Sequence, residues 1–266
     1  MCNKKWIIRI LLPINKYSFQ IFLILLLILI IPFRLGIQLF IKPMPIWANV
    51  ILENGMYIII GSLIWIKRND LENFHIDKSS IIIFILSGTI FRIGSSLKQS
   101  LIICLMGLLI LYILIKGKFQ LKPRNSNANL WIIRSLYIGF FMPIILVTLS
   151  KLFISKTSTL DTWPGLLVGF TIFIYELSHV AVQEELIFRG FIWGYLKNYG
   201  LGDKKILIIQ AIIFWITHLN YINKPYTFWV VVPIMSLVLG LIAWRSRSIT
   251  YSAITHSMFN MMRFFV

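Results

Sequence analysis

Two adjacent glutamates and an arginine stand inside a strongly apolar segment of this chain, in the stretch QEELIFRGF (183–191). Glu185 and Arg189 are four residues apart, so on a helix they share a face and can form an ion pair. Glu184 is rotated by about 100° from Glu185 and points elsewhere. A charge at mid-membrane costs at least about 2.5–3.5 kcal/mol, so an acid in such a segment suggests a functional site. We expect Glu185 and Arg189 to serve packing and Glu184 to serve chemistry.

Two further apolar segments carry polar residues near a helix end or on one helix face. FWITH (214–218) puts His218 at the end of a short span, with Phe214 one turn earlier, and THSMFN (255–260) puts His256 and Asn260 four residues apart. Each alone fits a role in packing, because polar contacts between membrane helices contribute about 1–2 kcal/mol in peptides. Taken as one set, a carboxylate, two imidazoles and an amide can activate water and stabilise an oxyanion. If the chain is a hydrolase, Glu184 and these three side chains must meet around one water-accessible cavity.

The elements that must position these groups are membrane helices. Hydrophobic residues make up 58% of the 266 residues and charged residues 13%, against about 45–50% and about 25% in soluble domains. Runs such as FLILLLILIIPF (22–33) have the purity of membrane spans, which need about 20 residues. We predict an all-α polytopic transmembrane helix bundle with eight or nine spans. They are expected near residues 17–33, 44–66, 81–97, 100–115, 130–150, 164–183, 206–220, 226–244 and 250–266.

The net charge of +17 follows membrane topology and does not indicate nucleic-acid binding. With the N-terminus in the cytoplasm, sixteen Lys and Arg residues fall on the cytoplasmic side and six outside. This bias is the one that orients membrane proteins. The same cations would hold anionic lipid headgroups, so membrane lipid is an expected partner and nucleic acid is not.

A polar connector, KGKFQLKPRNSNAN (116–129), separates two kinds of sequence. We expect residues 1–163 to be N-terminal scaffold helices and residues 164–266 to form the catalytic transmembrane domain. Residues 164–196 contain no proline after Pro164, and one helix of this length would be about 50 Å long. That is longer than a bilayer core, so the helix must tilt or continue into the cytoplasm, with its glutamate pair in the inner part of the membrane.

At these three motifs the chain resembles the CPBP intramembrane proteases, which include the type II CAAX prenyl endopeptidases and the bacterial Abi proteins. The family pattern is E-E-x-x-x-R, F-x-x-x-H and H-x-x-x-N/D on successive helices, here EELIFR (184–189), FWITH (214–218) and HSMFN (256–260). The resemblance covers residues 164–266. It implies that Glu184 is the general base and that His218 orients the water with it. It further implies that His256 and Asn260 donate to the oxyanion, with Glu185 and Arg189 in support.

The resemblance leaves the question of a metal open, because members of the family are often called metalloproteases. If a divalent metal such as zinc is used, Glu184, His218 and His256 are a three-ligand set with an open position for water. No H-E-x-x-H step is present, and a carboxylate with an imidazole can activate water alone, so we expect no metal and no other cofactor. Glu176 and His179 form one Glu-x-x-His step, but a di-iron site needs two.

The sequence thus predicts an intramembrane endopeptidase that cuts a membrane-associated peptide or protein. The resemblance implies a prenylated substrate, and a bacterial source, with the protein in the plasma membrane, would favour a pheromone, a bacteriocin leader or a membrane-protein segment. The alternative is a non-enzymatic bacteriocin-immunity or scaffold protein whose polar cluster serves packing. A transporter is disfavoured because the chain has no repeated halves.

Overall fold

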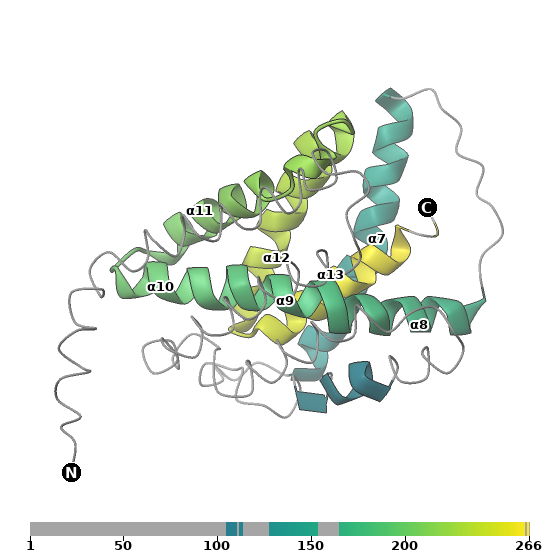
Figure 1. Ribbon diagram of the computed structural model, residues 1–266, viewed down its shortest axis with the longest axis horizontal. Coiled ribbons are helices and arrows are strands. Elements are labelled where there is room, and N and C mark those ends of the chain that lie inside the picture. The colour runs from purple at the N-terminus through teal and green to yellow at the C-terminus, as the bar shows by residue number, and fades with distance from the viewer. Residues whose placement is uncertain (1–104, 111, 114–127, 154–164, 264, 266) are drawn as a thin grey trace, which may run out of the picture.

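The computed structural model describes residues 105–110, 112–113, 128–153, 165–263 and 265, and these form helices joined by short turns (Figure 1). The predicted all-α class is confirmed for this part of the chain, which contains no β-strand. The predicted spans near 17–33, 44–66 and 81–97 lie outside the described residues, so the count of eight or nine stays a prediction. The elements are α7 (Ala128–Phe153), α8 (Leu166–Glu176), η2 (Leu177–Ala181), α9 (Val182–Glu185), η3 (Leu186–Ile192), α10 (Trp193–Asn198), α11 (Asp203–Ile216), η4 (Leu219–Tyr221), η5 (Thr227–Val231), α12 (Val232–Ser246) and α13 (Ile249–Met262).

Elements α8 to α10 follow one another end to end as a single long helix, as the absence of internal proline predicts (Figure 1). Two wide π-helical turns, η2 and η3, interrupt its α-helical geometry on either side of α9. Such turns are rare in proteins overall, and those that occur are often at functional sites. The helix ends in a Schellman motif, in which Gly200 has φ +79° and the Leu201 N–H donates to the Leu196 carbonyl at 3.2 Å.

Helices α11 and α12 form an antiparallel pair whose backbones approach closely at a glycine. A Cβ atom on Gly240 of α12 would lie 2.4 Å from Nε2 of Gln210 and 2.6 Å from Cδ1 of Leu207, both on α11. The absence of a Cβ atom at this position therefore leaves room for both side chains. After α12, Arg247 adopts a left-handed conformation with φ 55°, and Ser248 caps α13 by accepting from the Thr250 N–H at 3.2 Å.

Helix α7 packs along α13, again through a glycine. A Cβ on Gly139 would lie 2.6 Å from Cβ of Met258 and 2.7 Å from the Thr255 carbonyl oxygen. The Thr255 hydroxyl also donates to the Ser135 carbonyl of α7 at 3.2 Å. Helix α7 therefore lies against the back of the helix that carries His256.

The opposite face of α7 exposes a stripe of large apolar side chains at every fourth position. Ile133, Tyr137, Phe141 and Ile145 are 62%, 62%, 41% and 56% exposed. Contiguous apolar surface of this kind suits contact with lipid. Within the described residues, two helices are long and apolar enough to cross a membrane, Asn129–Ser150 and Thr227–Ser246.

Candidate active site

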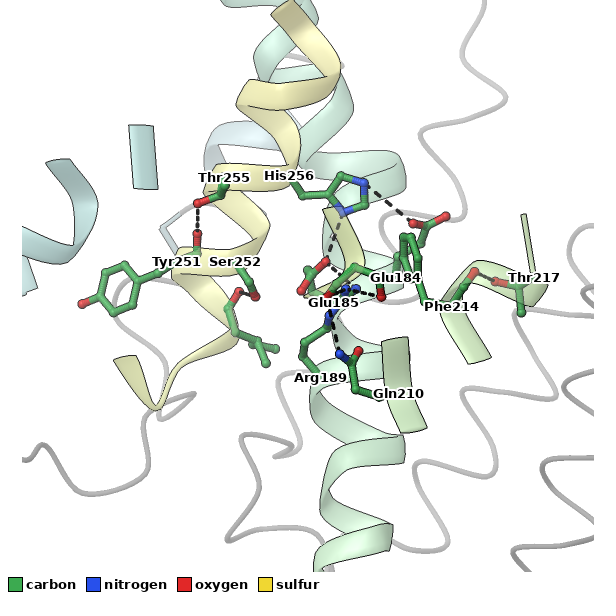
Figure 2. Close-up of polar contacts among 12 residues, drawn as sticks. Glu184, Glu185, Arg189, Gln210, Phe214, Thr217, Tyr251, Ser252, Thr255 and His256 are labelled. Carbon is green, nitrogen blue, oxygen red and sulfur yellow. Dashed lines mark hydrogen bonds and ion pairs between the residues drawn. The ribbon is translucent and has the colours of Figure 1, made fainter. Parts of the chain in front are cut away.

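The three motifs, which are far apart in the sequence, converge in the interior of the bundle. Glu184 and Glu185 lie on α9, His218 lies between α11 and η4, and His256 lies on α13. Their exposed fractions are 5%, 0%, 8% and 5%, respectively. Figure 2 shows His256 pointing to both glutamates from the neighbouring helix. The site is thus built by three separate segments of the C-terminal bundle.

Glu184 lies between the two imidazoles. Its Oε1 is 3.8 Å from Nε2 of His218, and its Oε2 is 3.8 Å from Nε2 of His256. Both distances are longer than a direct hydrogen bond. They are within the range that a small motion can close, and catalytic hydrogen bonds in ligand-free sites are often long. The geometry therefore brings the predicted base and both predicted histidines together.

His218 is held by the residue that precedes it by one turn. Its Nδ1 lies 2.7 Å from the Phe214 carbonyl oxygen, and the two rings stack with centroids 4.3 Å apart. A carbonyl oxygen only accepts, so Nδ1 must carry the proton in this contact. In the neutral imidazole, Nε2 then presents its lone pair towards Glu184. The F-x-x-x-H spacing thus fixes both the position and the tautomer of His218.

His256 is held by the supporting ion pair. Its Nδ1 lies 3.1 Å from Oε1 of Glu185, and the same oxygen accepts from Nη1 of Arg189 at 3.0 Å. The pairing of Glu185 with Arg189 is the one that their spacing predicts, and both side chains are fully buried. Nη2 of Arg189 also donates to the Ser236 carbonyl of α12 at 3.0 Å. The pair thus links α9, η3, α12 and α13 and orients the His256 ring.

Asn260, one turn after His256, makes a contact that the motifs do not predict. Its Nδ2 donates to Oε2 of Glu176, at the end of α8, at 2.9 Å. The sequence marks Glu176 through its Glu-x-x-His spacing from His179, whose side chain lies outside the described residues. Residue spacing does not predict the contact with Asn260, because that contact depends on how α8 and α13 are aligned.

All four predicted catalytic side chains line one cavity of about 170 Å³. The lining residues include Glu184, His218, His256 and Asn260, with apolar walls from α12 such as Val232 and Met235. This is the shared cavity that a hydrolase requires. A second, more apolar cavity of about 290 Å³ lies beside it between α7, η5 and α13. The two share Thr227, Val231, Phe259 and Arg263 as lining residues.

A further pair of buried residues supports the site without belonging to a motif. Gln210 of α11 is fully buried, and its Nε2 donates to the carbonyls of Leu207 at 3.0 Å and Ser236 at 3.4 Å. The Ser236 carbonyl is also the one that accepts from Arg189. A polar residue amid the apolar residues of 206–216 was the available sequence signal. Its partner on α12 was not predictable from spacing.

A metal ion needs several ligand side chains that point to one position. Within the described residues, no group of three His, Cys, Asp or Glu side chains is placed to hold a metal ion. We therefore derive no chemical step through a metal, and the expectation of metal-independent chemistry stays a prediction.

The fold and the site together define a helical bundle with a buried carboxylate flanked by two imidazoles, in which two of the described helices could cross a membrane. Comparison with protein-family models matches residues 163–262 to the type II CAAX prenyl endopeptidase Rce1-like family. This segment of the chain is similar to that family, as its three motifs predict, and it contains every residue of the candidate site. No curated protein matches the chain. Nor does any solved structure.

Proposed function

We propose that the protein is an intramembrane endopeptidase in which Glu184 activates the water that attacks a peptide bond. The observation that carries this proposal is the position of one buried carboxylate between the Nε2 atoms of His218 and His256, at the wall of a shared cavity. A structural ion pair needs one partner for each acid. Here Glu185 has such a partner in Arg189, whereas Glu184 faces two imidazoles in a cavity.

In the first step, Glu184 takes a proton from water, and the oxygen attacks the carbonyl carbon of the scissile bond. Nε2 of His218 presents a lone pair to the same region, so it accepts the second hydrogen of that water and orients it. Removing a positioned general base typically costs about 10²–10⁴-fold in rate. Glu184, once protonated, then donates to the leaving amine.

His256 and Asn260 stabilise the negative charge that develops on the carbonyl oxygen. Nδ1 of His256 already donates to Glu185, so Nε2 donates only when the ring carries both protons. Asn260 adds a neutral donor from the next turn of α13. Two preorganised donors are the usual arrangement for an oxyanion.

The proposed substrate is a membrane-associated peptide or protein. The family name points to prenylated C-terminal segments, and in a bacterial plasma membrane a pheromone or bacteriocin leader would fill the same role. The topology proposed with it has the N-terminus in the cytoplasm, from the distribution of Lys and Arg.

The test compares membranes from a strain lacking this protein, complemented at matched expression with wild type, with Glu184→Gln or with Asp203→Asn. New peptide termini are mapped by mass spectrometry. Asp203→Asn is the control, because it makes the same carboxylate-to-amide change in the partly exposed Lys197–Asp203 pair, away from the cavity. We expect termini with wild type and with Asp203→Asn that Glu184→Gln loses by at least about 100-fold.

If wild type and Glu184→Gln yield the same termini and rescue the same phenotype, Glu184 is structural. The non-enzymatic immunity or scaffold function would then replace the proteolytic one.

A further inference from the structure

Glu176 is a buried acid outside the three motifs, and its carboxylate accepts a hydrogen bond from a residue of the proposed oxyanion site. It lies at the last position of α8, directly before η2, and is 9% exposed. Its Oε2 accepts from Nδ2 of Asn260 at 2.9 Å. Glu176 does not line the cavity of about 170 Å³, whereas Asn260 does. The hydrogen bond to the Asn260 carboxamide therefore links Glu176 to the cavity.

A second hydrogen bond joins the same two helices one turn earlier. The Ser257 hydroxyl of α13 donates to the Phe173 carbonyl of α8, and these residues are three positions before Asn260 and Glu176, respectively. Helices α8 and α13 thus run side by side with two matching contacts one turn apart. The Ser257 contact ends on the backbone of α8, whereas the Glu176 contact is the one that holds the Asn260 side chain.

The orientation of a carboxamide decides whether it stabilises or repels an oxyanion. Nδ2 carries two hydrogens and Oδ1 carries none. An ionised carboxylate only accepts, so it selects the orientation in which Nδ2 faces Glu176. The second N–H on the same nitrogen then remains for the cavity. Without Glu176 the carboxamide can flip, and Oδ1 would present a partial negative charge in place of a donor.

We propose that Glu176 is a positioning residue that keeps an N–H of Asn260 directed to the oxyanion. The proposal rests on the proposed function, and assigns Glu176 an effect on the reaction through its hydrogen bond to Asn260. Loss of one oxyanion donor costs about 10²–10³-fold in turnover, because the donor acts where charge develops. Loss of its orientation is expected to cost part of this, about 10–100-fold.

The test is a double-mutant cycle on purified full-length protein in detergent micelles, with a synthetic peptide spanning the cleavage site mapped above. We expect Glu176→Ala to lower kcat by about 10–100-fold with KM changed by less than about threefold. Glu176→Gln should retain most of the activity, since its amide oxygen accepts the same hydrogen bond. In an Asn260→Ala background, Glu176→Ala should cost less than about threefold more, because its target is gone.

Ser257→Ala is the matched control, because it removes the neighbouring contact between the same helices and leaves Asn260 in place. We expect less than about a threefold loss of kcat from it. Additive losses from Glu176→Ala and Asn260→Ala, or an equal loss from Ser257→Ala, would overturn the positioning role and leave the proposed function intact. A wild type no more active than Glu184→Gln would instead overturn the proposed function, and the role of Glu176 with it.

Discussion

The buried ion pair of Glu185 and Arg189 gives the sharpest prediction on stability. Replacing Arg189 by Met keeps an unbranched apolar stem but removes the charge that neutralises Glu185. The lost contacts are the 3.0 Å bond to Glu185, the 3.0 Å bond to the Ser236 carbonyl, and the guanidinium packing 4.6 Å from the Phe214 ring centroid. We expect Arg189→Met to be strongly destabilising, because it leaves a fully buried carboxylate without its cation.

The size of the effect follows from burial. Both side chains are 0% exposed, and removing one partner of a buried pair costs about 3–5 kcal/mol. The chain also contains an ion pair of similar length at the surface, Lys197 with Asp203 at 2.8 Å, whose side chains are 40% and 30% exposed. An exposed pair contributes about 0.2–1 kcal/mol. The two pairs therefore separate the effect of burial from that of distance.

The assay is thermal unfolding in detergent of wild type, Arg189→Met and Lys197→Met. At about 2–4 °C per kcal/mol, Arg189→Met should lower Tm by about 6–20 °C and Lys197→Met by no more than about 4 °C. The double variant Glu185→Gln with Arg189→Met should recover at least half of the loss, since it leaves no buried charge unpaired while the glutamine still accepts from His256. Equal shifts for the two single variants would refute the argument from burial.

Three further predictions concern packing, metals and the histidine. Gly139→Leu should lower Tm by more than about 5 °C, because even its Cβ would clash with Met258 of α13. Gly165→Leu is the control and should lower Tm by less, because nothing lies within 4 Å of a Cβ at that position. Both variants are measured in the same unfolding assay. Treatment with EDTA or 1,10-phenanthroline should leave the rate of peptide cleavage within about twofold of the untreated rate, and a loss restored by added zinc would show that the mechanism needs a metal. Phe214→Leu keeps the carbonyl that holds His218 but removes the stacked ring, and should reduce kcat by less than about tenfold, against about 10²-fold or more for His218→Ala.

The sequence predicted those parts of the structure that depend on spacing along one helix. The Glu185–Arg189 pair, the separate direction of Glu184 and the single helix through residues 166–198 all follow from counting residues and from the absence of proline. The meeting of the three motifs also followed, because polar groups in apolar helices must share an interior. The number of spans and the boundary near residue 163 are not tested by the described residues.

Contacts that depend on the alignment of two helices were not predictable. The bond from Asn260 to Glu176 requires α8 and α13 to lie in one particular register, and a shift by one residue would turn Glu176 away by about 100°. The same holds for Gln210, whose Nε2 donates to the Ser236 carbonyl across α11 and α12, where Gly240 leaves room for the Gln210 side chain. Helical periodicity identifies the face of a residue but not its partner.

The π-helical turns loosen the link between residue spacing and side-chain direction in the motif helix. A π turn contains about one residue more than an α turn, so η2 lies between Glu176 and Glu184 as an insertion that the helix has absorbed. Deleting one residue from 177–181 would remove no catalytic group and would let this turn close to α geometry. Glu184 would then keep nearly its present direction relative to Glu176, whereas a deletion from a regular α-helical segment would turn it by about 100°. When relatives of this chain are compared, a gap of one residue in this interval is therefore compatible with the same site.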